Sequence, residues 1–408
     1  MIKRLKLILA SVVCGALVSI IFTVFEFLVK DGTEYIWNDV FNTDVVRWGV
    51  LPLAIAFSVA FSAVVKILGQ KRLVKPKLDP LEEEKHDQPA TIRSMSVIFV
   101  VGALSLIAGA SLGPEASLVA LSTAIGLWLA SKTREDKSAK LLALSSVGAL
   151  LVAFFGSLIP ILIPLLILYR QEKKLVLAHA SIPILSGLAG YLTLLIIADG
   201  HGFGTIPVSG RLELVDYATA FALGALCVLV ARALHGSIKR FYSSAKMIYA
   251  KLPWYVSGSI FGAILGLLYF IGGETVQFNG SDGSVELLHS QAEYGALAFL
   301  GLALVKLLVT GWSLAVGYRG GLIFPSVYTG VALSLFAHSV FGGLSENGLM
   351  IGSIAGIFSA LTGSPVMSLI MISSLISFNL VGLAIVGIAG TVLAQNTLKI
   401  FNNRILSG

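Results

Sequence analysis

Glu115 is the residue of this 408-residue sequence whose surroundings point most clearly to chemistry. It is the one acidic residue in a long apolar run over residues 97–130. Gly113 and Pro114 precede it, and proline fits the first position of a helix, where its missing N–H costs nothing. We therefore expect a helix that begins inside the run, with Glu115 in its first turn, where the positive end of the helix dipole stabilises an anion. Acids are common in helix first turns, so the elements around this helix must decide whether Glu115 is functional.

The composition is that of a polytopic membrane protein. Hydrophobic residues make up 56% of the chain, charged residues only 12%, and the mean hydropathy is +0.90. A soluble domain carries about a quarter charged residues. The net charge of +7 resides in short loops between apolar runs, which is the pattern of an orientation signal and speaks against a nucleic-acid partner. The six histidines are scattered, with no metal-ligand cluster, cofactor motif or H-E-x-x-H, so we expect neither a cofactor nor an enzyme.

The loop charges predict how the chain crosses the membrane. Residues 30–47 and 273–293 are acidic and are assigned to the outside. Four loops are rich in lysine and arginine, namely 70–93, 131–140, 170–174 and 235–251. By the positive-inside rule these loops and the N-terminus are cytoplasmic. Residues 1–30 form an N-terminal span, because their apolar run is too long for a signal peptide. We expect a multi-pass protein of the plasma membrane, the inner membrane in a bacterium.

Two apolar runs have basic loops at both ends and must return to the side from which they enter. Residues 94–130 are therefore expected to form a hairpin of broken helices that turns near Gly109–Glu115. Residues 141–169 behave alike, with Gly156, Pro160 and Pro164 as places where a helix can be interrupted. Glu26, near the end of the first span, is either functional or an interface-facing acid, and the second interpretation is favoured.

An internal repeat becomes visible when the chain is shifted by 207 residues against itself. Four small residues then coincide with identical ones, Ser146, Ala153, Gly156 and Ser157 with Ser353, Ala360, Gly363 and Ser364. Equivalent spans run in opposite directions, so residues 48–198 and 253–405 are expected to be inverted repeats within one transmembrane domain, 1–408. Such all-α proteins, with tilted and broken helices, place their site at mid-membrane between the halves.

The same shift brings Gly113–Glu115 onto Gly320–Leu322, within a second glycine-rich break over residues 318–330. Two helix N-termini are then expected to face one site from opposite sides, and their free N–H groups favour an anion there. Arg319 either raises the positive potential further or is a structurally paired arginine. Tyr318 and Tyr328 flank the break as pathway or packing residues, and Lys306 needs a partner inside its apolar run.

At this point the chain resembles the CLC family of chloride channels and transporters. Residues 112–126 are similar to the family's G-[KR]-E-G-P helix start, and 321–325 (GLIFP) to its G-x-F-x-P loop. Residues 358–365 and 389–395 resemble two later segments of the family. The resemblance covers roughly residues 48–408. It implies a homodimer with one anion pore per subunit, and no C-terminal regulatory domains within this chain.

The resemblance also assigns the site. Glu115 matches the gating glutamate, and Leu322 and Ile323 are expected to offer main-chain N–H groups to the anion. The full set of expected anion-binding residues is Gly113, Pro114, Ala116, Gly321, Leu322, Ile323 and Phe324, with Arg319, Phe401 and Asn402 as pathway residues.

Several family features are missing. The serine loop that coordinates the anion should lie near residues 73–80, which read LVKPKLDP. The proton-relay glutamate of the transporters should fall near Leu166–Ile167, and the nearest acid is Glu172. The pore tyrosine aligns near Phe401–Asn402. These departures favour channel-like passage of small anions, most simply chloride, over exchange for protons. The alternative is a proton-coupled carrier of another solute.

Overall fold

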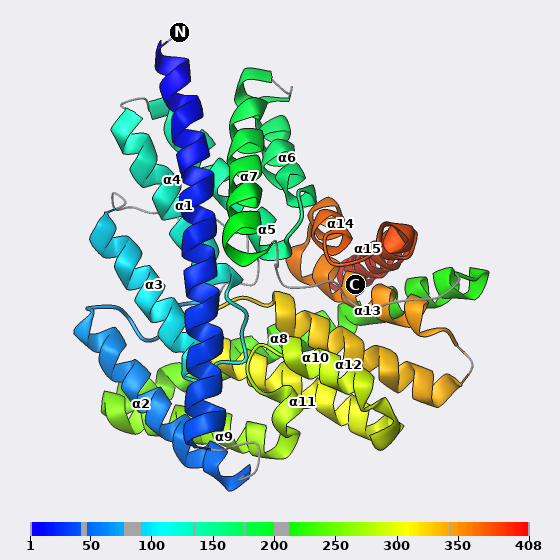
Figure 1. The fold of residues 1–408 in the computed structure, drawn as a ribbon. Helices are drawn as coiled ribbons and strands as arrows, with labels where there is room; N and C mark the ends of the chain where they lie inside the picture. The colour runs from blue at the N-terminus through cyan, green and yellow to red at the C-terminus, as the bar shows by residue number, and fades with distance from the viewer. Residues whose placement is uncertain are drawn as a thin grey trace.

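The computed structural model describes residues 2–41, 47–76, 91–133, 136–173, 177–199, 212–342 and 344–406 (Figure 1). Within these ranges the regular structure is helical, apart from one isolated bridge between Gly113 and Gly321. Eight of the described helices are long and apolar enough to cross a membrane. Together with the composition, this makes the chain a multi-pass integral membrane protein.

The first half of the chain begins with a long helix, α1 (Ile2–Thr33), which continues into a short π-helical segment, η1 (Glu34–Val40). A 3-10 turn, η2 (Arg47–Gly49), leads into α2 (Val50–Ile67). The remaining helices of this half are α3 (Ile92–Ile107), α4 (Glu115–Thr133), α5 (Asp136–Phe155), η3 (Ile159–Ile161), α6 (Leu162–Glu172) and α7 (Leu177–Ala198).

The second half begins with another long helix, α8 (Leu214–Lys251), followed by α9 (Trp254–Gly272). Short elements come next: η4 (Glu274–Val276), α10 (Ser281–His289) and η5 (Gln291–Glu293). The chain then forms α11 (Ala296–Ala315), α12 (Ile323–Phe341), α13 (Glu346–Thr362), α14 (Pro365–Ser373), η6 (Phe378–Leu380) and α15 (Val381–Leu406).

The two halves form an inverted-topology repeat, as the sequence predicts. Corresponding helices pack in corresponding ways: α1 on α7 and α8 on α15, then α4 on α5 and α12 on α13. Across the halves, α2 packs on its equivalent α9. Since α1 corresponds to α8 by this packing, we propose that each repeat begins with its long helix, earlier than residues 48 and 253.

The helix breaks recur at nearly the same spacing in both halves. Gly109 ends α3 with φ +89°, and Gly317 ends α11 with φ +86°. Gly156 follows α5 with φ +58°, and Gly363 follows α13 with φ +63°. Positive φ angles favour glycine, because the Cβ of any other residue would crowd the neighbouring backbone. The hairpin expected over residues 94–130 is therefore present, with its turn between α3 and α4.

Several predicted loops contain helix in the structure; α10 lies within the acidic loop 273–293, and one basic loop is helical throughout. Residues 235–251, expected to be a basic loop, are the C-terminal part of the 38-residue helix α8. Its lysines and arginine alternate with apolar residues, and Ile238 and Ala245 are buried. A helix that is apolar on one stripe and basic on the other satisfies both environments. The basic residues therefore predicted correctly where the apolar run ends, but α8 continues beyond that point.

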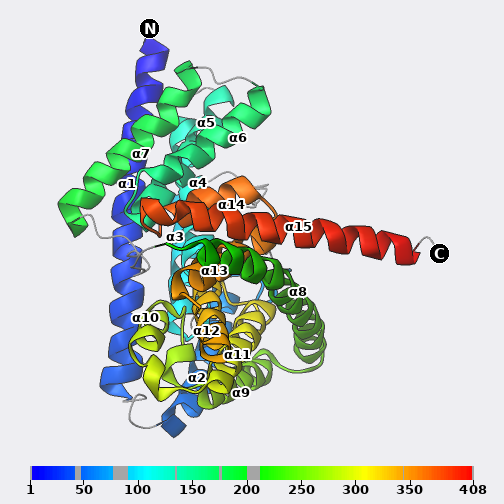
Figure 2. The same ribbon diagram turned by 90° about the vertical axis from the view of Figure 1, so that its right-hand side faces the viewer.

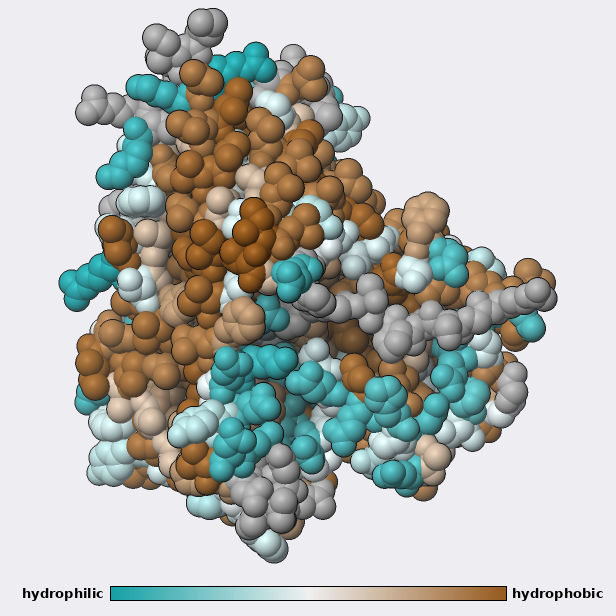
Figure 3. Space-filling view, viewed as in Figure 1, coloured by the Kyte–Doolittle hydropathy of each residue, from teal (hydrophilic) through white to brown (hydrophobic). Residues whose placement is uncertain are grey.

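The surface combines a large apolar area with polar patches. Figure 3 shows hydrophobic residues over α1 and α7, and hydrophilic residues gathered around α10. Exposed apolar side chains on α7, such as Leu192 and Ile196, are suited to lipid.

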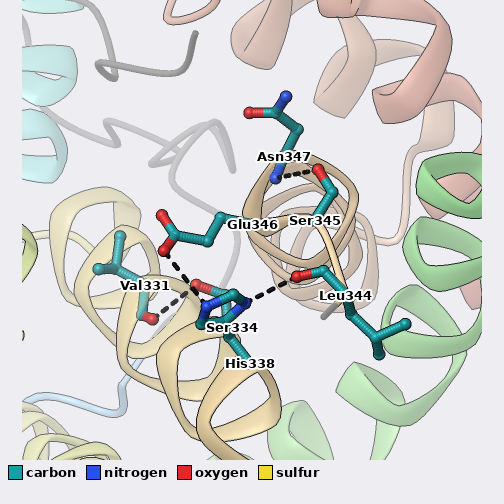
Figure 4. A network of polar contacts seen from close by, with 7 residues as sticks. All are labelled: Val331, Ser334, His338, Leu344, Ser345, Glu346 and Asn347. Carbon is teal, nitrogen blue, oxygen red and sulfur yellow. Dashed lines mark hydrogen bonds and ion pairs between the residues drawn. The ribbon is translucent and has the colours of Figure 1, made fainter. Parts of the chain in front are cut away.

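Polar contacts link the end of α12 to the start of α13 (Figure 4). His338 Nδ1 lies 2.7 Å from the Leu344 carbonyl oxygen, and its Nε2 lies 3.7 Å from a Glu346 oxygen. At the start of α13 the Ser345 hydroxyl accepts from the Asn347 N–H at 3.3 Å. These contacts connect the two helices at the end of α12 remote from Glu115.

Candidate functional site

Two interrupted helices meet at the centre of the fold. Gly113, before α4, and Gly321, before α12, form a short antiparallel bridge. The Gly113 N–H donates to the Gly321 carbonyl at 3.0 Å, and the Gly321 N–H donates to the Gly113 carbonyl at 2.7 Å. The two breaks are thus held together by main-chain bonds, and the N-termini of α4 and α12 are fixed side by side.

Glu115 joins these two N-termini. It is buried in the first turn of α4, and its Oε1 accepts a short hydrogen bond from the N–H of Ile323, the first residue of α12. The N–H groups of Phe324 and of Glu115 itself also contribute at the carboxyl. Free N–H groups at two helix N-termini stabilise negative charge. The carboxylate therefore lies where the sequence predicts that an anion would bind.

The second carboxyl oxygen has a different environment. Glu115 Oε2 is buried and has no hydrogen-bond partner among the residues that the structure describes. A Cβ on Gly113 would overlap Oε2, so only glycine leaves room for it. A buried oxygen without a donor is costly for a carboxylate and is a natural place for a proton. The arrangement thus supplies donors for one oxygen and leaves the other available for protonation.

A cavity of about 560 Å³ ends beside this site. Its inner wall includes Leu112, Pro114 and Phe324, which flank the Glu115–Ile323 contact. Its outer wall carries charged residues from α1, η1 and α10, namely Glu26, Lys30, Glu34 and Asp282. These outer elements belong to the segments whose acidic loops were assigned to the outside. Small ions and water can therefore come close to Glu115 from that face, while Glu115 itself stays buried.

The structure brings most of the expected anion-binding residues together. Gly113 and Gly321 donate to each other's carbonyls, so neither has a free N–H group for an anion. Their role in the structure is to let the two main chains approach closely. Pro114 opens the first turn of α4, since its carbonyl accepts from the Leu118 N–H at 3.0 Å. Ala116 is half-buried, and Leu322 precedes α12 with its carbonyl bonded to Ser326. Of the set, Ile323 and Phe324 contribute N–H groups that already face a carboxylate. Anion binding by the set stays a prediction.

Arg319 is bound to the main chain. Its guanidinium donates to the carbonyls of Gly317 and Lys71, each at 2.7 Å, and its backbone N–H donates to the Ser105 hydroxyl at 2.7 Å. It thus fastens the turn after α2 to the second break. Its charge still lies next to that break, but the side chain is committed to carbonyl partners.

The expected pathway residues Phe401 and Asn402 lie near the C-terminal end of α15. Figure 2 shows the C-terminal half of this helix projecting from the body. Their side chains lie outside the described part of the structure, and so do residues 77–80 of the LVKPKLDP segment. Their roles stay predictions.

Four residues that support or surround the site had weak sequence signals or none. The Trp37 indole donates to the Ile107 carbonyl at 2.9 Å and packs where a Cβ on Gly109 would lie. Lys306 is fully buried and donates to the carbonyls of Val276 and Phe278, each at 2.9 Å.

Glu26 lies in the cavity wall. The cavity keeps both interpretations of Glu26 open, a functional acid or one that faces the membrane interface. Arg72 is buried against the second break, although it was counted only as a loop charge. The sequence could single out Lys306 and Glu26 because each is a charge inside an apolar run. Nothing in the sequence marked Trp37 or Arg72 as part of the site.

Fold and site together define a multi-pass transport protein in which two broken helices of an inverted repeat converge on one buried carboxyl. A comparison with known families agrees. The profile of the family described as voltage gated chloride channel matches residues 81–396. The chain therefore belongs to this family, the CLC family that the sequence motifs resemble.

Relatives and solved structures support the same assignment. YfeO of Escherichia coli O1:K1 / APEC, which is named as an ion-transport protein, is 30% identical over 267 residues. YfeO of strain E2348/69 is 31% identical over 265 residues. In both cases the match covers 64% of this chain and spans 62% of the relative's length.

Among solved structures, a slow cyanobacterial Cl⁻/H⁺ antiporter is similar with TM-score 0.78 and 15% identity over 98% of both chains. A CLC-type fluoride/proton antiporter is similar with TM-score 0.73 and 17% identity over 94% of both chains. At these identities the likeness shows the fold.

Proposed function

We propose that the protein conducts small anions, chloride first among them, along a path that Glu115 opens and closes. The observation that carries the proposal is the hydrogen bond from the Ile323 N–H to the Glu115 carboxyl. The carboxylate occupies the position that two helix N-termini prepare for an anion, so carboxylate and anion compete for the same donors. While Glu115 holds these donors, the path is closed.

Opening requires the side chain to leave. A proton on Glu115 removes the charge that the N–H groups of Ile323 and Phe324 attract, and an arriving anion displaces the carboxylate directly. The cavity beside Pro114 and Phe324 offers room for the released side chain on the outer face. Because Oε2 has no donor, a proton can add there without breaking an existing bond.

We favour channel-like conduction over anion–proton exchange. The position that the resemblance gives to the inner relay glutamate is occupied by Leu166 and Ile167. The nearby acid, Glu172, ends α6 and contacts His179 Nδ1 at 2.8 Å, so its carboxyl is engaged there. Exchange is the second candidate, and what favours it is that two solved proteins of this fold are Cl⁻/H⁺ and fluoride/proton antiporters.

The proposal extends to the assembly and its place in the cell. We propose a homodimer with one path per subunit, in the plasma membrane, with the N-terminus in the cytoplasm. The support is the family resemblance and the basic residues at the N-terminus, Lys3, Arg4 and Lys6.

Reconstitution into liposomes with a chloride gradient tests this function. Chloride efflux and proton uptake are recorded together, and protein-free liposomes are the control. We expect efflux without matching proton movement. Proton uptake in fixed ratio to chloride would establish exchange, and no halide-dependent efflux at all would favour the carrier of another solute.

A further inference from the structure

Arg72 is a buried cation that lacks an acidic partner within the described part of the chain. Its residue exposure is 2%, yet the ion pairs found there include none with Arg72. The Nε–H donates to the Val316 carbonyl at 2.9 Å, and Nη2 lies 3.5 Å from the Ser58 hydroxyl. Nη1 is buried and has no hydrogen-bond partner within the described ranges. Burying a charge is unfavourable unless it is paired, so this guanidinium is incompletely satisfied.

Aromatic rings surround the guanidinium. Its Cζ lies 4.4 Å from the ring centroid of Phe61, 4.6 Å from that of Tyr318 and 5.9 Å from that of Phe261. These rings stabilise a cation through their π-electrons, but they accept no N–H hydrogen bond of ordinary strength. The rings therefore exclude water without satisfying Nη1.

A second donor beside Arg72 is also unsatisfied. Among the described residues, the buried Tyr318 hydroxyl interacts with Arg72 and has no other hydrogen-bond partner, so its own O–H has no acceptor. Two donors that share one dry location, one of them charged, call for an acceptor that carries negative charge. A halide accepts from several donors at once and brings the charge that Arg72 lacks.

The location is tied to the second helix break. A Cβ on Gly317 would overlap the Arg72 carbonyl, and Arg319 donates to the neighbouring Lys71 carbonyl at 2.7 Å. Tyr318 stands three residues before Gly321, which forms the main-chain bridge with Gly113 next to Glu115. We infer that Arg72 and the Tyr318 hydroxyl form a binding site for a small monovalent anion, additional to the Glu115 site. The inference rests on the proposed function only for the choice of chloride as the ligand.

The purified full-length protein tests the site through chloride-dependent thermal stability. A ligand that binds the folded state raises the unfolding temperature as its concentration rises. Chloride replaces gluconate at constant ionic strength, and wild type is compared with Tyr318→Phe and Arg72→Lys. Tyr328→Phe is the matched control, because the Tyr328 hydroxyl is buried but lies 3.1 Å from that of Thr275.

Tyr318→Phe separates a binding role from a structural one. Apart from its interaction with Arg72, its hydroxyl has no hydrogen-bond partner among the described residues, so its loss should leave the unfolding temperature in gluconate near that of wild type. We expect chloride to bind on the order of tenfold more weakly, as for the loss of one hydrogen bond to an ion. Arg72→Lys should behave alike where it folds. Tyr328→Phe should unfold earlier in both salts and keep the full rise with chloride.

Two results would overturn the site: a wild type that chloride does not stabilise, or a Tyr318→Phe protein that chloride stabilises as strongly as wild type. The Tyr318→Phe result does not bear on gating, which is measured by flux through Glu115 variants. Conversely, a Glu115 variant with unchanged flux would leave the Tyr318 result standing.

Discussion

At the scale of single residues, the site depends on two glycines and one acid. Glu115 reaches the N-terminus of α12 because Gly113 and Gly321 let two main chains meet without side chains between them. The Ile323 N–H then binds one carboxyl oxygen, and the other oxygen stays without a donor. A gate built this way is sensitive to the addition of a single methyl group.

Gly321→Ala should release the gate. The added Cβ would lie 2.7 Å from Glu115 Oε1 and would also overlap the rest of that side chain, so the carboxyl loses its place at α12. We expect anion leak in liposomes to rise several-fold. Gly301→Ala is the control, since no atom of the described residues lies within 4 Å of a Cβ there. Equal leak in the two variants would show that the contact does not close the path.

At the scale of elements, the site is positioned by loops that buried polar side chains fasten. Trp37 from η1 and Tyr269 from α9 both donate to the end of the α3 break, Tyr269 to the Gly109 carbonyl at 2.6 Å. Lys306 from α11 holds the loop that carries Phe278, a residue of the cavity wall. Its ammonium also lies 5.0 Å from the ring centroid of Tyr328.

Lys306→Met should destabilise the fold through that loop. Methionine fills similar space but donates nothing, so the carbonyls of Val276 and Phe278 lose their common donor. Each buried group left unsatisfied costs about 1–3 kcal/mol. We expect a clearly lower unfolding temperature in detergent, whereas Lys251→Met, at an exposed position, should unfold like wild type. If the two variants unfold alike, Lys306 does not secure the loop.

The element scale also shows how far the sequence can predict. The breaks before Glu115 and Ile323 were predictable, because glycine and proline interrupt helices and two basic loops forced a hairpin. The hydrogen bond from Arg319 to the Lys71 carbonyl was not predictable, because it joins residues 248 positions apart in the chain. The end of α8 was misplaced since charge marks the membrane edge and not the end of a helix. The position of Glu26 in a cavity wall could not be predicted, because the cavity forms only when several helices pack together.

At the scale of the whole molecule, the inverted repeat brings two equivalent breaks to one place from opposite directions. The shift of 207 residues predicted that pairing within one residue, since Gly113 meets Gly321 instead of Gly320. Sequence could not give the register, which is set by the main-chain bonds between the breaks. The proposed orientation places α10 and the C-terminal end of α4 on opposite sides of the membrane.

Cysteine labelling should establish that sidedness. Both native cysteines, Cys14 and Cys227, are buried, so the wild-type chain provides a low background. Glu286→Cys, exposed on α10, should react with a membrane-impermeant maleimide added to intact cells. Lys132→Cys, exposed at the end of α4, should react only after permeabilisation. The reverse pattern would invert the proposed orientation.

The central claim is that the Glu115 carboxylate closes an anion path by holding the Ile323 N–H, and chloride efflux from liposomes tests it most directly. Efflux is compared across external pH for wild type, Glu115→Gln and Glu115→Ala. Wild-type efflux should rise as the pH falls, because protonation releases the carboxyl. Both variants should leak faster, about tenfold or more for the loss of a charged hydrogen bond, with little dependence on pH. Flux that matches wild type at every pH in both variants would contradict the account.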